Sequence, residues 1–190
     1  MKEAREAIMQ ALMKTDRMSL LKFDRSSAGL VLDYVLRNRA FLQAWEPERN
    51  DDYYTEEFQA DLLDKESKLI VDGHLFKVWM QYEGALIGSI ALSNIVRGAF
   101  QSCHLGYRMD ERLANRGLMT EGVRAVISYA FDVINLHRIE ANIMPRNVAS
   151  LMVVKKLGFY EEGLAYKYLK INGVWEDHLH MVLRNEAMES

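Results

Sequence analysis

The sequence predicts a mixed α/β domain in which a central sheet is flanked by helices. Segments with the two-residue periodicity of strands alternate with segments that carry apolar residues at helical spacing. A helix predicted over 120–135 stands between two predicted strands, an arrangement typical of a unit that joins parallel neighbours. The dipeptide Asn172-Gly173 between two alternating segments indicates a closing hairpin.

The domain organisation is expected to be simple. The chain has 190 residues and two prolines, with no Gly/Ser-rich linker and no repeat. This length suits one compact domain with a single core. Residues 1–17 carry acidic side chains between short apolar patches, so we expect an amphipathic helical extension there and not a secretory signal. Residues 18–190 are expected to form the single domain.

The N-terminal part is expected to hold one strand and two helices. The strand is predicted over 17–23, and a serine at 26 or 27 caps the first helix, which runs to about residue 40. A loop follows at 41–52, and a second helix with a polar outer face at 53–67. The inner face of the first helix is expected to carry Leu30, Val31 and Tyr34.

Strand patterns then dominate. Three strands are predicted, at 75–82, 85–93 and 103–109, with a turn at Glu83-Gly84. The helix over 120–135 leads to an alternating strand over 137–144. Asn147 is expected to cap a last helix, which ends in two lysines and a glycine before the hairpin.

The composition excludes several classes of protein. Of the residues, 49% are apolar and 27% are charged, and the net charge is −3. These values argue against disorder and give no support to a nucleic-acid partner, and no apolar run approaches the about 20 residues that span a membrane. We expect a cytoplasmic protein, a monomer or a homodimer. The single cysteine, Cys103, is expected to lie in the core.

The segment LANRGLMTEG, residues 113–122, delivers one glycine to the start of the helix predicted over 120–135. Exposed amides in a first helical turn favour anions. Neither common phosphate-loop pattern is present, so nicotinamide and P-loop nucleotide sites are disfavoured. Taken alone, the segment favours an ordinary helix start, since most helix N-termini bind no ligand.

Four dispersed segments follow one another along the chain: FLQAWEPER, SNIVRGAFQSCHLGYRMDERLANRGLMTEG, HRIEANIMPRNVASLMVVKKLGF and NGVWEDHLHMVL. Taken together, they resemble the GNAT family of N-acetyltransferases and, within it, the ribosomal-protein-alanine (RimJ/RimL-type) branch. The resemblance runs from about Met18 to Arg184 and implies the GNAT fold, with a V-shaped gap between two parallel strands.

The resemblance implies acetyl-CoA as the donor. Pantetheine would pair with the backbone of Tyr107, Arg108 and Met109, and the Met109 amide would hold the oxyanion of the thioester carbonyl. Gly106 is consistent with a bulge in this strand. Ala114 and Met119 stand where the family's loop signature has other residues, and a bulky side chain at 119 would narrow the anion site. The pyrophosphate would lie on the amides of Asn115, Arg116, Gly117, Leu118, Met119 and Thr120.

The resemblance also suggests catalytic residues. Val154 stands where many relatives have a tyrosine acid, so Ser150 is the candidate acid or hydrogen-bond donor, with Tyr160 in reserve; the alternative for Ser150 is a bond to its own helical turn. Asn147 either holds the pantetheine amide, caps the helix, or does both. Glu46 is a candidate base acting through water, or a plain surface carboxylate.

The acceptor side is less determined by the sequence. The candidates there are Trp45, Glu46, His104, Tyr168, Trp175 and Asp177, with His178 beside them; packing explains each of the aromatic residues equally well. No cluster of His, Asp or Glu has metal-ligand spacing, so no metal is expected.

Three functions remain open from the sequence. The first is acetyl transfer to the N-terminal α-amine of a protein, such as a ribosomal protein, by direct attack. The second is transfer to a small amine such as a polyamine, an amino sugar or an antibiotic. The third is a CoA-binding sensor without turnover, which the departures at Ala114, Met119 and Val154 would explain.

Overall fold

The computed structural model describes residues 11–189 and contains one eight-stranded sheet in the order β1-β2-β3-β4-β5-β6-β8-β7. Only the β5–β6 pair is parallel. The strands are β1 Ala11–Lys14, β2 Ser19–Leu21, β3 Phe76–Tyr82, β4 Ala85–Val96, β5 Ser102–Met109, β6 Arg138–Ile143, β7 Tyr160–Ile171 and β8 Val174–Arg184. The mixed sheet predicted from the sequence is therefore confirmed.

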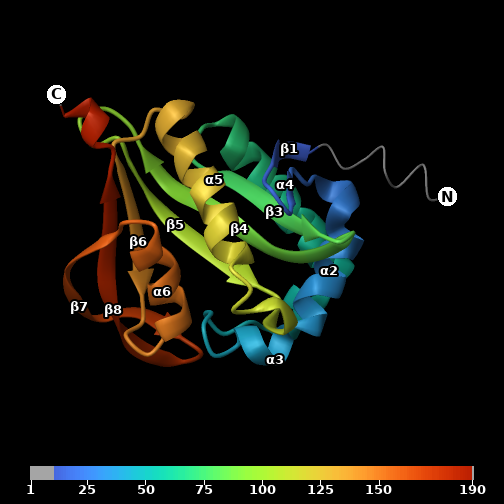
Figure 1. Cartoon of the computed structure of the whole chain (residues 1–190). Coiled ribbons are helices and arrows are strands. Elements are labelled where there is room, and N and C mark those ends of the chain that lie inside the picture. The colour runs from blue at the N-terminus through green and yellow to red at the C-terminus, as the bar shows by residue number, and fades with distance from the viewer. Residues whose placement is uncertain (1–10, 190) are drawn as a thin grey trace.

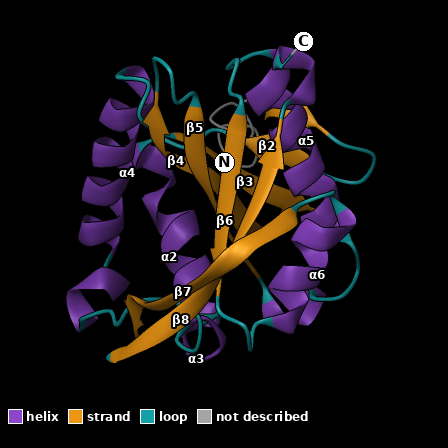
Figure 2. Cartoon of the chain, turned by 90° about the vertical axis from the view of Figure 1, so that its left-hand side faces the viewer, coloured by secondary structure: helices purple, strands orange, loops and turns teal. Residues whose placement is uncertain are grey.

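Helices cover both faces of the sheet (Figures 1 and 2). α5 and α6 lie on one face, and α2 and α4 lie on the other. The helices are α2 Ala28–Arg37, α3 Arg39–Leu42, α4 Glu56–Val71, α5 Leu118–Asp132 and α6 Val148–Lys156, with 3-10 turns η1 Arg25–Ser27, η2 Asp51–Tyr54, η3 Glu111–Leu113 and η4 Glu186–Met188. The predicted turns Glu83-Gly84 and Asn172-Gly173 are present, with positive φ at all four residues.

The structure corrects three expectations. The helix predicted over 1–17 is wrong for Ala11–Lys14, which form an edge strand paired with β2; residues 1–10 lie outside the described residues. Leu30 does not lie on the inner face of α2, since it is 39% exposed, whereas Val31 and Tyr34 are buried as expected. No bulge occurs at Gly106, which pairs in regular register with Ala91.

The parallel pair β5–β6 opens into a V. Pairing runs from Ser102 opposite Arg138 to His104 opposite Glu140, and stops there. From residue 105 onward β5 pairs only with β4, while β6 continues its pairing with β8 to Ile143. Figure 1 shows the two strands diverging below this point. The V-shaped splay predicted from the family resemblance is confirmed.

Side-chain alternation assigns residues of the V to its two faces. On β5, Leu105, Tyr107 and Met109 pack on the core beneath α5 and α6, so Gly106 and Arg108 belong to the opposite face. We call the face of the sheet covered by α5 and α6 the α5 face, and the face covered by α2 and α4 the α2 face.

The other arm of the V follows the same rule. On β6, Ile139, Ala141 and Ile143 pack in the α5-face core, which places Glu140 and Asn142 on the α2 face. Cys103 is buried in the same core, as expected, and burial raises the pKa of its thiol to about 12.

The C-terminal end of α2 fixes the end of β5. The Arg37 guanidinium donates to the Asp110 carboxylate (2.8 Å) and to the carbonyl of Leu86 (2.8 Å). The Asn38 side chain accepts from the amide of Glu111 (3.2 Å). The loop from β5 to α5 is therefore held from the opposite layer.

Candidate functional site

The start of α5 forms an anion-binding arrangement on the α5 face. Gly117 is the N-cap in the left-handed region (φ 75°), and no side chain caps the helix. Asn115 also has a positive φ of 63°. The first intrahelical bond is made by the amide of Glu121 to the Gly117 carbonyl (3.0 Å). The amides before it are therefore free to hold an anion at the positive end of the helix dipole.

Met119 does not obstruct this arrangement. Its side chain is buried in the core, as is that of Leu118, whereas Asn115, Arg116 and Gly117 are exposed. The departure from the family's loop signature at Met119 thus fills the core, because α5 turns that side chain away from the exposed amides.

A clamp from the N-terminal segment borders the same helix turn. Arg17 Nε lies 2.6 Å from Glu121 Oε2, and the Arg17 guanidinium also donates to the carbonyl of Arg116 (3.1 Å). The Thr15 hydroxyl and the Arg17 amide donate to the other Glu121 oxygen. These bonds hold the pKa of Glu121 below its usual value against the opposing effect of burial. Sequence reasoning missed this clamp, which joins residues about a hundred positions apart.

Tyr107 and Ser150 meet across the V. The Ser150 hydroxyl donates to the Tyr107 phenol (2.8 Å), and the phenol donates to the carbonyl of Ser150 (3.0 Å). Burial raises the pKa of Tyr107 to about 12, while the bond from Ser150 lowers it. Asn147 accepts from the amide of Ser150 (3.1 Å), so it caps α6 as expected. Val154 is fully buried and offers no acid.

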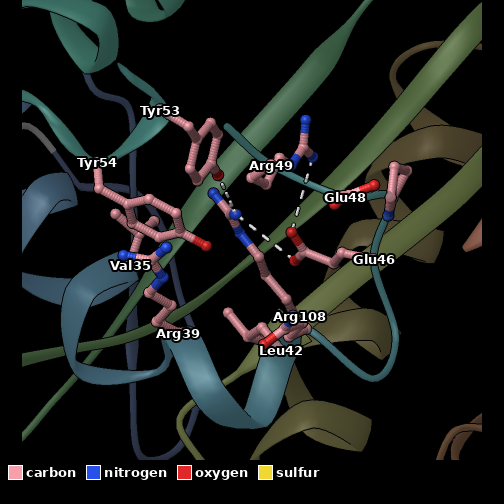
Figure 3. A pocket seen from close by; sticks show the side chains of 11 residues that line it. Val35, Arg39, Leu42, Glu46, Glu48, Arg49, Tyr53, Tyr54 and Arg108 are labelled. Atoms are coloured by element: carbon pink, nitrogen blue, oxygen red, sulfur yellow. Dashed lines mark hydrogen bonds and ion pairs between the residues drawn. The ribbon is translucent and has the colours of Figure 1, made fainter. Parts of the chain in front are cut away.

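The α2 face carries a polar pocket of about 180 Å³ beside β5 (Figure 3). Arg108 enters it from β5 and donates to the Tyr53 hydroxyl (2.9 Å). Glu46 lies between two guanidinium groups, 3.6 Å from Arg108 and 3.7 Å from Arg49. Glu46 is thus a pocket residue, and the side chain of Arg108 points away from the α5 face. The pocket is lined by Val35, Arg39, Leu42, Gln43, Glu46, Pro47, Glu48, Arg49, Tyr53, Tyr54 and Arg108.

The loop that carries Trp45 and Glu46 is fixed to the C-terminal hairpin. The amide of Asn172 donates to the carbonyl of Glu46 (3.2 Å). Arg146 donates to the carbonyl of Ala44 (3.1 Å), and its guanidinium lies 5.0 Å from the Trp45 ring. The segment therefore borders the open end of the V from the α2 side.

The remaining acceptor-side candidates separate into two groups. Tyr168 lies beside His178 and His180, with ring centroids 5.6 and 5.0 Å away, and so belongs to the α2 face. Asp177 instead accepts from the amide of Lys167 (2.8 Å), at an irregularity of β7, and Trp175 is exposed on the hairpin.

His104 on β5 and Tyr160 on β7 lie level with the part of the sheet where β5 and β6 are still paired. His104 contacts Glu140 (3.8 Å) and Asn94 (3.2 Å). Tyr160, the reserve acid, pairs with Val182 on β8 and donates its hydroxyl to Glu162 (3.0 Å). Neither side chain joins the Ser150 pair.

Two further observations complete the description of residues 11–189. No group of three or more His, Cys, Asp or Glu side chains in this range is placed to hold a metal ion. No helix in this range has the length and apolar character needed to cross a membrane.

Comparisons with known proteins agree with this geometry. The family model of the acetyltransferase (GNAT) domain matches residues 17–160. The probable N-acetyltransferase YjcK of Bacillus subtilis (strain 168) is 43% identical over 150 residues, which are 78% of this chain and 83% of the relative. The ribosomal protein uS5-alanine N-acetyltransferase of Escherichia coli (strain K12) is 36% identical over 177 residues, 92% of this chain and 91% of the relative.

A solved structure extends the agreement to three dimensions. The ribosomal-protein-S5-alanine acetyltransferase from Vibrio fischeri superposes with a TM-score of 0.87 at 35% identity, covering 92% of this chain and 96% of that one. The chain therefore belongs to the GNAT family of acetyl-CoA-dependent N-acetyltransferases, in the branch of the ribosomal-protein-alanine acetyltransferases.

Proposed function

We propose that this protein transfers an acetyl group from acetyl-CoA to the N-terminal α-amine of a protein, with a ribosomal protein that begins with alanine as the preferred acceptor. The observation that carries the proposal is the 36% identity, over 92% of the chain, to an enzyme named for that acceptor. The open V supports it, because it separates a donor side from an acceptor side.

The donor is assigned to the α5 face. The uncapped amides from Asn115 to Thr120 fit a pyrophosphate, since they combine unpaired donors with the positive end of the helix dipole. The backbone of Tyr107, Arg108 and Met109 borders the V and offers strand-like hydrogen bonds to pantetheine. Asn147 uses its side-chain oxygen in the cap, which positions Ser150, so we assign its NH2 group to the pantetheine amide.

The chain's own groups act on the thioester from two directions. The Met109 amide holds the developing oxyanion. As the C–S bond breaks, the Ser150 hydroxyl turns its single proton from the Tyr107 phenol to the sulfur, and the phenol turns to donate to Ser150 Oγ. A serine hydroxyl is a far weaker acid than a thiol, so Ser150 stabilises the departing thiolate and does not need to give up its proton. No covalent enzyme intermediate is required.

The acceptor is assigned to the α2 face, where Glu46, Arg108 and Tyr168 lie. An α-amine has an ordinary pKa of about 8 and a lysine amine one of about 10.4, so near neutrality the neutral fraction of the α-amine is larger by roughly 300-fold. We therefore expect the site to act on α-amines more readily than on lysine amines, because more of the α-amine is in the neutral form that attacks.

An acetyl-CoA assay over matched acceptors tests the proposal. One peptide begins with Ala and lacks lysine, a second has a blocked N-terminus and one lysine, and the third acceptor is spermidine. We expect kcat/KM for the first peptide to exceed that of the second by about 100-fold or more. Acetylation of spermidine without acetylation of either peptide would instead support the small-amine function. Acetyl-CoA binding without turnover on any acceptor would support the sensor.

A further inference from the structure

Four polar side chains form one cluster on the α2 face, where β6, β7 and β8 meet: Asn142, Tyr168, His178 and His180. Asn142 lies directly opposite His180 in the β6–β8 register and donates to the Tyr168 hydroxyl (3.3 Å). The Tyr168 ring lies against both histidines. Because β5 no longer pairs with β6 beyond Glu140, Asn142 stands at the open part of the V.

Two atoms of the cluster lack hydrogen-bond partners among residues 11–189. Asn142 Oδ1 and His180 Nε2 are both buried, and no residue in the described range bonds to either atom. A buried polar atom without a partner destabilises the fold, because it has lost its hydrogen bonds to water. A ligand that brings N–H donors would remove this cost, so the cluster is suited to an amine.

His178 has a defined tautomer. Its Nδ1 lies 3.1 Å from the carbonyl oxygen of Glu176, which can only accept, so Nδ1 carries the proton. The neutral ring then presents a lone pair at Nε2, and none of residues 11–189 is seen to donate to that atom. A neutral imidazole with one nitrogen fixed and the other open has the form of a general base.

The surroundings keep His178 neutral near pH 7. Burial lowers its pKa below the ordinary value of 6.5, and the charge of His180 acts in the same direction. The bond to the Glu176 carbonyl and the charges of Glu176 and Asp177 oppose this shift without reversing it. Tyr168 from β7 and Asn142 from β6 complete the set of polar groups around it.

We propose that His178 is the general base of the reaction and that Asn142 Oδ1 and Tyr168 hold the acceptor amine beside it. This inference rests on the proposed acetyl transfer to an α-amine. Glu46 is less suited to the role, because both its oxygens face guanidinium groups, those of Arg108 and Arg49.

The proton balance of the step is simple. The lone pair of the neutral amine forms the C–N bond to the thioester carbonyl, and one N–H proton passes to His178 Nε2. The C–S bond then breaks, its electron pair leaves with the sulfur, and Ser150 donates a hydrogen bond to that sulfur. The imidazolium releases its proton to solvent, which restores the neutral base.

The test compares His178→Asn with the wild-type enzyme on the Ala-starting peptide. Asparagine keeps a donor near Nδ1 for the Glu176 carbonyl but removes the base at Nε2. We expect kcat to fall about 100-fold, while the Kd for CoA stays unchanged because CoA is assigned to the other face. His74→Asn is the matched control, since this exposed histidine lies in the turn after α4.

The pH profile separates chemistry from structure. Once pH falls past the lowered pKa of His178, log kcat/KM of the wild type should fall with a slope of about two, because one proton binds the amine and one binds His178. The variant should fall with a slope of about one. An unchanged slope and kcat in His178→Asn would overturn the inference while leaving the transferase function intact. A wild-type enzyme that acetylates no N-terminal peptide would overturn the proposed function itself.

A second variant tests the amine-holding group independently. Asn142→Leu preserves shape, removes the unpaired acceptor together with the bond to the Tyr168 hydroxyl, and leaves His178 in place. We expect KM for the peptide to rise about tenfold with a smaller change in kcat. An unchanged KM would exclude Asn142 from acceptor binding, whether or not His178 proves to be the base.

Discussion

The Ser150 hydroxyl and the Tyr107 phenol form a closed hydrogen-bonded pair between α6 and β5: the serine donates to the phenol at 2.8 Å, and the phenol donates to the serine's own carbonyl at 3.0 Å. The pair spans the V, since β5 forms one arm and α6 follows the other. Tyr107 thereby fixes the rotamer of Ser150 and the spacing of the arms.

Tyr107→Phe should lower kcat about tenfold with little change in the Kd for CoA, because Ser150 loses the acceptor that orients it. Ser150→Ala should lower kcat by the same amount or more. If the two residues act as one unit, the double variant should be no slower than Ser150→Ala alone. Additive losses in this double-mutant cycle would show that Tyr107 acts independently of Ser150.

Arg17→Ala should raise the Kd for CoA about tenfold. The guanidinium neutralises Glu121, whose carboxylate stands in the first turn of α5 beside the amides assigned to the pyrophosphate. Without Arg17, that negative charge would repel the phosphates. Adding Glu121→Gln to Arg17→Ala should restore most of the affinity, whereas Arg124→Ala, at an exposed position of α5, should have no effect. A double variant as weak as Arg17→Ala would contradict this explanation.

The sequence predicted those parts of the fold that depend on local pattern. The alternation in β3, β4 and β6 and the Asn172-Gly173 turn are short-range signals, and each is present in the structure. Ala11–Lys14 was assigned wrongly because its residues favour helices, and its strand exists only through pairing with β2. Leu30 was misplaced because helical spacing does not tell which neighbouring layer a side chain meets.

In the candidate site, too, the sequence predicted the features that depend on local signals and missed those that depend on contacts between distant segments. Gly117 and Asn147 were found because caps are local signals. The partners of Tyr107 and of Arg17 were missed because each contact joins segments far apart in the chain, and no periodicity reports such a pairing. The sequence names His178 beside the acceptor-side candidates, but the tautomer of His178 depends on its bond to the Glu176 carbonyl.

Glu46→Gln should raise KM for the peptide about tenfold and leave the Kd for CoA unchanged. The carboxylate lies between Arg108 and Arg49 in the pocket on the α2 face, so its loss leaves a mostly buried cation without its counter-charge and disturbs the acceptor side alone. Glu57→Gln, at an exposed position of α4, is the matched control. Equal effects of Glu46→Gln on both ligands would mean that the loop supports the whole fold and not the acceptor side.

Asp110→Asn should lower the free energy of unfolding at pH 7 by about 1–3 kcal/mol, because it weakens a charge-assisted pair, with a buried carboxylate, that ties β5 to α2. Bonds from Arg112, and then from Arg37, hold the pKa of Asp110 well below its ordinary value of 3.8, although burial opposes them. The stabilisation is therefore complete above about pH 4 and is lost as pH falls towards the folded-state pKa. Chemical denaturation from about pH 7 to about pH 2 measures this. The wild type should lose stability below about pH 4 more steeply than the variant, while Asp33→Asn, at an exposed position of α2, should follow the wild type; parallel curves for all three would exclude Asp110 as the source.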